Sequence, residues 1–316
     1  MKHLAPFLLP AGLFLVICFL FPLLLGIGVS FFSLDKSTLE FSFGAPFCGL
    51  SNYQAIFSAG SSYMDGLLDA LENTVMYTIC VSVGSIGLGL GGALLVMKNF
   101  RGARIVRPLL LLSWVVPSYV VGILWGFMWQ QDDGIINTVL FDFLHWDVIS
   151  KQFGVVWSYS ATGELVKPLW LTGQNTIWAI IIPTIWRNWP FCMMMFLAGL
   201  TSIPGEIYEA SAMDGASPRD QFFRITLPLL KPVFALIVLQ NIILNVFSFN
   251  IVAMMFGNGS GFPGKYGDLL MTFLYRTTFQ TWNLGIGAAL STVFMGMMLA
   301  VVFLWYGSFW KEYNDG

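Results

Sequence analysis

The chain has 316 residues, of which 57% are hydrophobic and only 10% are charged, and its mean hydropathy is +0.75. This is more apolar surface than one soluble core buries, and the apolar runs reach about 20 residues, the length that crosses a bilayer. The apolar composition therefore predicts an all-α polytopic membrane protein. The formal net charge of −2 gives no reason to propose nucleic-acid binding.

Six apolar segments have the length of membrane spans. The first is longer than the apolar region of a signal peptide, which has about 7 to 15 residues, and no small-residue cleavage site follows it. It is therefore predicted to be a span, and because six is even, both termini are predicted to lie on the same side. The predicted spans cover residues 7–32, 70–97, 108–129, 174–200, 232–256 and 284–309.

Lys and Arg residues outside these spans are distributed unequally between the two sides. The side of the termini carries nine of them in short segments, and the other side carries five in longer segments. Because short basic segments stay in the cytoplasm, both termini are predicted to be cytoplasmic. The clearest example is KNFRGARIVR at residues 98–107, whereas most acidic residues fall on the opposite side.

A polar segment separates the fourth and fifth predicted spans. Residues 206–232, EIYEASAMDGASPRDQFFRITLPLLKP, carry seven charged side chains. The pattern predicts a short amphipathic helix over 206–212, a turn in which Gly215 takes a positive φ, and a second helix that begins at Pro218. Shape and charge alone fit an interfacial loop. The small alanines of the segment also fit a surface on which another protein closes.

The same segment carries a known motif. Glu209, Ala210 and Gly215, followed by ITLP at 225–228, resemble the EAA loop of permease subunits in binding-protein-dependent ABC importers. The wider stretch FLAGLTSIPGEIYEASAMDGASPRDQFFRITLPLLKP is similar to the carbohydrate-uptake branch of that family, the maltose and glycerol-phosphate type. Ser211 departs from the family, because the second Ala of the motif is usual there.

Other stretches agree with this resemblance along most of the chain. GLSNYQAIF precedes the second span, GIINTVL follows the third, WRNWPF lies in the fourth and GNGSGFPG follows the fifth. Their order resembles the first of the two permeases that such importers usually pair. Residues 141–172 depart from the family, since they form a longer external segment that contains tryptophan.

The resemblance implies a type I ABC importer fold, with about six transmembrane helices and a cytoplasmic EAA coupling helix that docks on a separate ATPase. Residues 1–69 would form an N-terminal helix and an external segment. Residues 70–316 would form a permease core of five helices, with the EAA loop at about 201–231. Glu209 would pair with a basic group of the ATPase, and Asp214 also fits a solvated charge. The implied ATPase-coupling residues are Glu209, Ala210, Ala212, Asp214, Gly215 and Ala216.

The resemblance also implies the rest of a transport complex. The chain would be a multi-pass subunit of a bacterial or archaeal cytoplasmic (inner) membrane. It would form the path for a sugar, either an oligosaccharide, a disaccharide or a related polyol, delivered by an extracytoplasmic binding protein. Its partners would be a second permease and two ATPase subunits. Those ATPase subunits would bind ATP and Mg²⁺, so no cofactor is expected in this chain.

The sequence itself gives no site for ATP hydrolysis. GSGFPGK at residues 259–265 has part of the spacing of a phosphate-binding loop, but Tyr266 stands where Ser or Thr would bind Mg²⁺. The Cys and His residues lack metal-ligand spacing, and no catalytic triad is visible. The chain is therefore predicted not to be an enzyme.

Polar residues in the fifth predicted span indicate a substrate path, because such groups need a partner or a water-filled cavity. Asn241, Asn245 and Ser248 are spaced to share one helical face, with Leu244 between them. Amide groups of this kind suit the paired hydroxyls of a sugar. Hydrogen bonds between helices, worth about 0.6 kcal/mol each, are an equally good explanation from the residues alone.

The fourth predicted span carries a similar stripe. Thr184, Asn188 and Phe191 share a helical face, and an aromatic ring suits the apolar face of a sugar. Arg187 is the only basic residue deep in a span, where a cation costs about 2.5 to 3.5 kcal/mol. It is expected to face an anion, carbonyl groups or water, either as a substrate contact or as a structural or gating partner.

An ion-coupled secondary sugar transporter is the alternative interpretation of the polar stripes. Such a protein normally carries intramembrane Asp or Glu for ion coupling. The predicted spans contain essentially none beyond Glu72, which lies near the end of a span.

Overall fold

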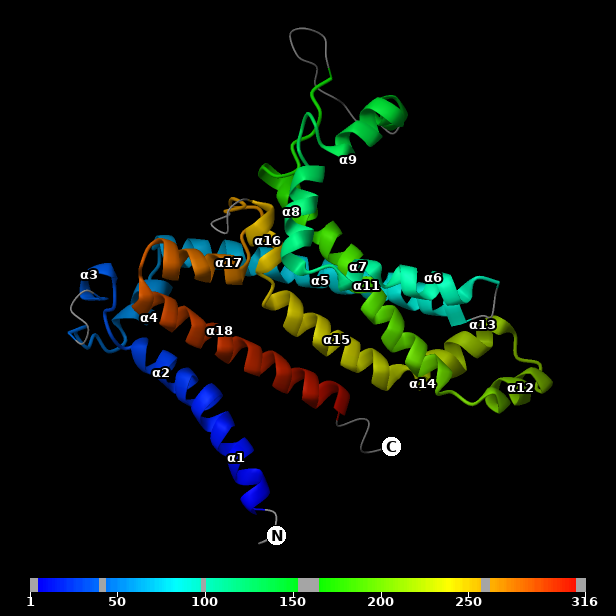
Figure 1. Ribbon diagram of the computed structural model, residues 1–316, viewed down its shortest axis with the longest axis horizontal. Coiled ribbons are helices and arrows are strands. Elements are labelled where there is room, and N and C mark those ends of the chain that lie inside the picture. The colour runs from blue at the N-terminus through cyan, green and yellow to red at the C-terminus, as the bar shows by residue number, and fades with distance from the viewer. Residues whose placement is uncertain (1–4, 40–43, 98–100, 153–164, 257–261, 311–316) are drawn as a thin grey trace. The chain divides into compact units, whose positions relative to one another are not determined.

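The computed structural model describes residues 5–39, 44–97, 101–152, 165–256 and 262–310. Helices are the main regular structure of these ranges, and an isolated antiparallel bridge joins Phe32 to Phe47 (Figure 1). They fall into two compact units. One joins the N-terminal part, up to Leu68, to Met271–Tyr306, and the other runs from Asp69 to Leu270 and resumes at Gly307. The predicted all-α fold is confirmed, while the division at residues 69 and 70 stays a prediction.

The first unit is built on two apolar helical runs. α1 (Ala5–Leu15), η1 (Val16–Leu20) and α2 (Phe21–Val29) are consecutive, and α18 (Leu284–Trp305) packs on α2. Within Leu9–Val29, the apolar window of membrane-spanning length is not buried at all, as for a helix that faces lipid. The short helices of this part are α3 (Lys36–Leu39), α4 (Ser51–Phe57), α17 (Leu270–Tyr275) and η5 (Arg276–Gln280). η6 (Tyr306–Trp310) begins where the second unit resumes.

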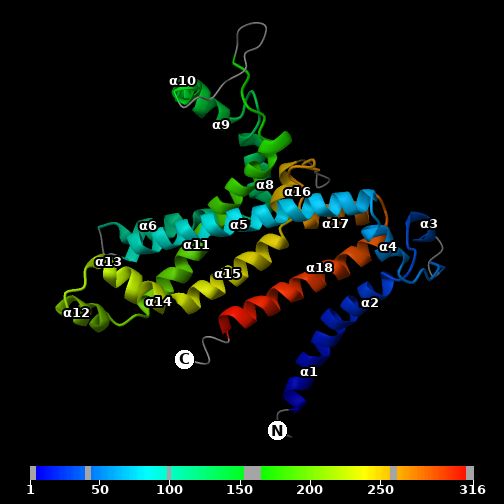
Figure 2. The ribbon, with the colours of Figure 1, turned by 180° about the vertical axis from the view of Figure 1, so that it is seen from behind.

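Three helices carry the core of the second unit. They are α5 (Ser62–Met97), which begins in the first unit, α11 (Thr176–Thr201) and α15 (Lys231–Val246). Figure 2 shows α5 alongside α11 and α15. Two buried clusters of side chains join these helices, one including Tyr77, Val81, Ile180 and Ile181, the other including Ile86, Phe196, Leu230 and Ile237.

The third predicted span is bent where Pro117 interrupts it. Ala103–Val115, which comprises α6 (Ala103–Leu110) and α7 (Leu112–Val115), meets α8 (Ser118–Met128) at 87°. Proline lacks an N–H donor and disfavours the helical conformation in the residue before it, and Val116 accordingly has an extended ψ of 126°.

The fifth predicted span, residues 232–256, is not one helix. α15 ends at Val246, and α16 (Asn250–Met255) begins after Phe249, whose φ of −134° and ψ of −54° are not helical. On its other side α15 meets the helical segment Pro218–Leu229 at 61°. That segment comprises α13 (Pro218–Gln221), η4 (Phe222–Thr226) and α14 (Leu227–Leu229).

The number of spans depends on how these bends are counted. Among the described residues, four helices are long and apolar enough to cross a membrane, and there are up to six if each bent pair is one span. The prediction of about six agrees with the larger count. Residues 108–129 and 232–256 were each predicted as one span, and the structure shows a backbone break in both, which hydropathy does not detect because it averages over the break.

The helices that follow the two breaks, α8 and α16, pack against each other (Figure 1). A Cβ atom on Gly122 would lie 2.5 Å from the carbonyl oxygen of Ile251, and one on Gly126 would lie 2.9 Å from that of Met255. Gly122 and Gly126 are four residues apart, as are Ile251 and Met255, so one face of α8 meets one face of α16. The absence of side chains at the two glycines permits this close approach.

The external segment between α8 and α11 has a folded base. The Asn137 side chain is fully buried, and its amide donates to the carbonyls of Gln131 at 2.9 Å and Pro168 at 3.1 Å. Its Oδ1 accepts a hydrogen bond of 2.7 Å from the Trp170 indole, which gives one of the tryptophans of this longer segment a structural role. The helices of the segment are α9 (Ile135–Asn137), η2 (Thr138–Phe143), α10 (Trp146–Lys151) and η3 (Gly173–Asn175).

Candidate functional site

The polar segment between α11 and α15 forms a helix, a bend and a second helix. α12 (Gly205–Met213) ends at a turn in which Gly215 has a φ of +82°. The backbone N–H of Gly215 donates to the carbonyl of Ala212 at 3.0 Å. α13 then begins at Pro218, which confirms the predicted turn and the predicted start of the second helix. We call residues 205–221 the coupling loop.

Side chains of the coupling loop brace its two helices against each other. The Gln221 amide donates to the Tyr208 carbonyl at 3.1 Å and to the Ser211 hydroxyl at 2.9 Å, and Ser211 donates to the same carbonyl at 2.9 Å. Ser211 therefore has a local function at the position where the family usually has Ala. The Ser217 hydroxyl caps α13 by accepting from the N–H of Asp220, whose carboxylate accepts from the N–H of Ser217.

The outer surface of the coupling loop is open. Five of the six predicted coupling residues are exposed, and Ala216 is half-buried. Met213 is 89% exposed, although it is apolar, and the sequence analysis did not select it. The exposed coupling residues are Glu209, Ala210, Ala212, Asp214 and Gly215.

Polar side chains of α5, α11 and the end of α15 meet in a buried cluster. The hydroxyl of Tyr77, a fully buried side chain, donates to Thr184 Oγ1 at 3.0 Å and lies 2.9 Å from Ser248 Oγ. Because a phenol carries one proton, Ser248 donates to Tyr77. Thr184 in turn donates to the carbonyl of Ile180 at 2.8 Å. Tyr77, Thr184 and Ser248 form the Tyr77 cluster, which lies where α15 ends.

The two asparagines of α15 lie between helices. Asn245 is 2% exposed, and its amide donates to Ser82 Oγ of α5 at 3.4 Å. Asn241 is 6% exposed and donates to the carbonyl of Ile237 at 2.9 Å and to Cys192 Sγ of α11 at 3.5 Å. The structure thus shows the interhelical bonding that the residues alone left open.

The predicted stripe on the fifth span is only partly present. Asn241 and Asn245 share a buried face, but Leu244 is 57% exposed and points elsewhere. Ser248 follows the end of α15, so the helical spacing that was used to place it on the same face does not apply.

Arg187 reaches the break in the third span. Its Nε donates to the carbonyl of Val116 at 3.2 Å, and its Nη1 donates to Asn188 Oδ1 at 3.3 Å. Because Val116 lies between α7 and α8 with an extended ψ, its carbonyl has no partner within a helix. The prediction that Arg187 faces a carbonyl, an anion or water is confirmed for the carbonyl. Phe191 packs on Trp114, with ring centroids 5.6 Å apart.

Sequence reasoning missed Tyr77, Ser82 and Ser118, which take part in these contacts. Tyr77 and Ser82 lie in an apolar run, where only tertiary contacts reveal their partners. Ser118 and Asn250 are the first residues of α8 and α16, and the Asn250 amide donates to Ser118 Oγ at 3.3 Å. Pro117, which directly precedes Ser118, was the sequence feature that could have predicted a helix start at Ser118. Parts of two sequence motifs lie outside the described residues, namely residues 98–100 of KNFRGARIVR and 257–261 of GNGSGFPG.

Comparison with known proteins places the chain in a family. Residues 85–312 match the model of the binding-protein-dependent transport system inner membrane component family. The sulfoquinovosyl glycerol transport system permease SmoG of Agrobacterium fabrum is 31% identical over 93% of this chain and 86% of its own length. The trehalose/maltose transport system permease MalF of Thermococcus litoralis is 31% identical over 84% of this chain and 82% of its own length.

A solved structure gives the same fold. A chain of the bacterial alginate ABC transporter, crystallised in complex with an alginate pentasaccharide-bound periplasmic protein, matches with a TM-score of 0.73 and 18% identity. The match covers 97% of this chain and 93% of that chain. The family match favours the importer interpretation over the ion-coupled secondary transporter. The chain therefore belongs to the binding-protein-dependent transport system inner membrane component family and is a permease subunit of an ABC importer, not its ATPase.

Proposed function

We propose that this permease carries a sugar or a related polyol across the membrane after an extracytoplasmic binding protein delivers it. The observation that carries the proposal is the likeness, over more than four fifths of the chain, to permeases named for sulfoquinovosyl glycerol and for trehalose and maltose. The proposed complex contains a second permease and two ATPase subunits. The ATPase subunits bind ATP and Mg²⁺.

The coupling loop is the proposed ATPase contact. Its exposed small residues permit close approach, and Glu209 offers a charge for a basic partner. Closure of two ATPases moves membrane helices only through a rigid element that both sides hold. The bonds of Gln221 to Tyr208 and Ser211 supply that rigidity.

The proposed orientation places the coupling loop and both termini in the cytoplasm. Within the second unit, the coupling loop and the basic start of α6 lie at one end, and α9 lies away from them (Figures 1 and 2). Arg101 and Arg104 at this end are exposed. Short basic segments stay on the cytoplasmic side, which supports this orientation.

The eight predicted substrate residues are proposed to shape the path in two ways. Asn188 and Phe191 are half-buried and Leu244 is exposed, so these side chains have surface available to a sugar. The other five side chains form hydrogen bonds between helices or at the breaks in the third and fifth spans, and through these bonds they set the geometry of the path. This second group contains Thr184, Arg187, Asn241, Asn245 and Ser248.

Purification tests the proposed assembly. We expect the chain to co-purify with a second permease and two ATPase subunits, and a screen of sugars with the binding protein to identify one that stimulates ATP hydrolysis. The isolated chain is expected to hydrolyse no ATP, because its sequence provides no nucleotide site. Robust ATPase activity from the chain alone would overturn this assignment. Stimulation only by a non-carbohydrate ligand would overturn the substrate class and leave the importer intact.

Alanine substitutions separate the two groups of residues. Asn188→Ala is expected to lower uptake about two- to tenfold, because a lost neutral hydrogen bond contributes about 0.5 to 1.5 kcal/mol. Phe191→Ala is expected to impair large sugars more than small ones. Asn241→Ala and Asn245→Ala are expected to lower the melting temperature of the complex without changing sugar preference. The measurements are uptake of a sugar panel per folded complex and the melting temperature. Unchanged sugar preference and uptake in both Asn188→Ala and Phe191→Ala would refute the substrate contacts.

A further inference from the structure

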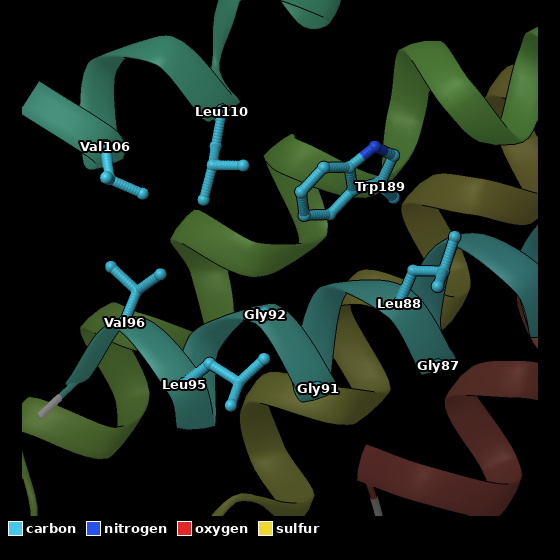
Figure 3. A pocket seen from close by; sticks show the side chains of 9 residues that line it. All are labelled: Gly87, Leu88, Gly91, Gly92, Leu95, Val96, Val106, Leu110 and Trp189. Carbon is cyan, nitrogen blue, oxygen red and sulfur yellow. The ribbon is translucent and has the colours of Figure 1, made fainter.

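An apolar groove runs along one side of the second unit, between α5, α6 and the Trp189 ring of α11. Its volume is about 650 Å³. In Figure 3 the α5 helix forms the floor, while Val106 and Leu110 of α6 and the Trp189 indole stand over it. The lining contains only aliphatic residues, glycines and this indole: Gly87, Leu88, Gly91, Gly92, Leu95, Val96, Val106, Leu110 and Trp189.

The glycines of α5 divide between two faces. Gly84 and Gly89 touch α11 so closely that a Cβ atom would lie 2.5 Å from the side chains of Ile185 and Cys192, respectively. At Gly87 and Gly91, in contrast, a Cβ atom would meet nothing within 4 Å. The packing of α5 on α11 therefore explains one set of glycines, and the other set keeps the floor of the groove open.

Cations without acidic partners lie at one end of this groove. Val96 and Val106 mark that end in Figure 3, and Arg101, Arg104 and Arg107 lie in the chain between them or directly after. Residues 73–131 contain no Asp or Glu. Within the described ranges, none of these three arginines forms a salt bridge.

Arg107 contacts a residue that lines the groove. Its Nη2 donates to the carbonyl of Val96 at 2.8 Å, and Val96 lines the groove. Its Nε is buried and has no hydrogen-bond partner. Arg101 and Arg104 are exposed and lie just before and within the first turn of α6, so this end of the groove carries positive charge that is open to solvent.

We propose that this groove binds an anionic phospholipid, with an acyl chain along Gly87 and Gly91 and the phosphate at Arg101 and Arg104. An apolar trough that opens at a cluster of cations complements a molecule with an apolar tail and a negative head group. Basic pockets between helices on the Lys- and Arg-rich side of a membrane protein bind such lipids. A helix of another protein would fill the groove but would leave the cations uncompensated, unless it carried acidic residues there. The inference depends only on the membrane location and is independent of the transported substrate.

Quenching of Trp189 by brominated lipid tests the site. The complete complex is reconstituted in nanodiscs whose phosphatidylglycerol or phosphatidylcholine carries brominated acyl chains. The chain contains 12 tryptophans, so the Trp189 signal is taken as the difference between the wild type and Trp189→Phe. We expect brominated phosphatidylglycerol to quench this signal more strongly than brominated phosphatidylcholine at equal mole fraction. Unlabelled phosphatidylglycerol is expected to reverse the quenching.

Two variants locate the tail and the head group separately. Gly91→Phe places a ring in open space and is expected to abolish the preference for phosphatidylglycerol. Gly296→Phe is the matched control, because Gly296 on α18 also has nothing within 4 Å, and it is expected to have no effect. The double variant Arg101→Gln/Arg104→Gln is expected to lower the preference at least about fivefold, since each cation near an anionic lipid contributes about 1 kcal/mol.

The remaining outcomes contradict the proposal. Equal quenching by the two lipids, with no effect of the arginine substitutions, means that the groove contacts bulk lipid without selecting it. Absence of quenching by either lipid means that protein covers the groove, and a helix of the second permease is then the occupant. An unaltered preference in Gly91→Phe means that the lipid binds elsewhere.

Discussion

Replacing Gly215 by valine is expected to lower transport about five- to thirtyfold while the protein still inserts and assembles. Gly215 has a φ of +82°, and a Cβ atom there would meet nothing within 4 Å, so the only obstacle is the backbone conformation. A left-handed conformation costs an L-residue about 1 to 2 kcal/mol, and a β-branched residue tolerates it poorly. This free energy corresponds to about a five- to thirtyfold loss of the loop conformation that docks. The measurement is uptake per ATP hydrolysed by the purified complex in proteoliposomes.

Two further variants show whether the backbone is the cause. Gly215→Asn is expected to restore much of the transport, because asparagine tolerates a positive φ better than other side chains. Gly205→Val is the matched control within the same loop, since a Cβ atom on Gly205 would also meet nothing within 4 Å and the φ of Gly205 is not positive.

Glu209→Lys is expected to uncouple transport by reversing the charge that faces the ATPase. Normal coupling in both Gly215→Val and Glu209→Lys would show that the loop does not dock as proposed.

Replacing Gly122 by alanine is expected to destabilise the protein by about 1 to 3 kcal/mol. The new methyl group would lie 2.5 Å from the carbonyl oxygen of Ile251 and 3.0 Å from Cβ of Met254, so α8 and α16 must separate. Added bulk in a packed interface costs this much because backbone and side chains shift together. Since both helices follow breaks in their spans, their separation is also expected to lower transport. The measurements are the melting temperature of the complex and uptake.

Gly296→Ala is the control for this effect. Gly296 lies within α18, and a Cβ atom there meets nothing within 4 Å. Both substitutions gain the same helix propensity, about 0.5 to 1 kcal/mol, so the two variants differ only in packing. We expect Gly296→Ala to be neutral or stabilising. A melting temperature of Gly122→Ala equal to that of Gly296→Ala would mean that α8 and α16 are not in close contact.

The coupling loop was largely predictable from its sequence. The structure has a helix that ends at Met213, a positive φ at Gly215 and a helix that begins at Pro218. Each feature depends on residues close together in the chain, namely a glycine that adopts a left-handed conformation and a proline that fits a first helical turn. What the sequence did not predict was the role of Ser211, whose bond from Gln221 joins residues of two helices.

The breaks in the spans were predictable to different extents. Pro117 marks the first break, and a closer reading of its missing N–H group would have found it. The second break lies between Val246 and Asn250, in the sequence FSF, which contains neither proline nor glycine. There the Ser248 hydroxyl bonds to Tyr77, which is 171 residues away in the chain, and no local pattern encodes such a contact.

The sequence by itself determined that this protein crosses a membrane, where the first, fourth and sixth spans lie to within a few residues, and which segment forms the coupling loop. These features follow from composition and from short-range patterns, which do not depend on the rest of the fold. Only the tertiary structure decided which polar residues face other helices. Asn245 is 2% exposed against α5, whereas its neighbour Leu244 is 57% exposed. Helical periodicity fixes the angle between two side chains on one helix, but what lies opposite each face depends on how the other helices pack.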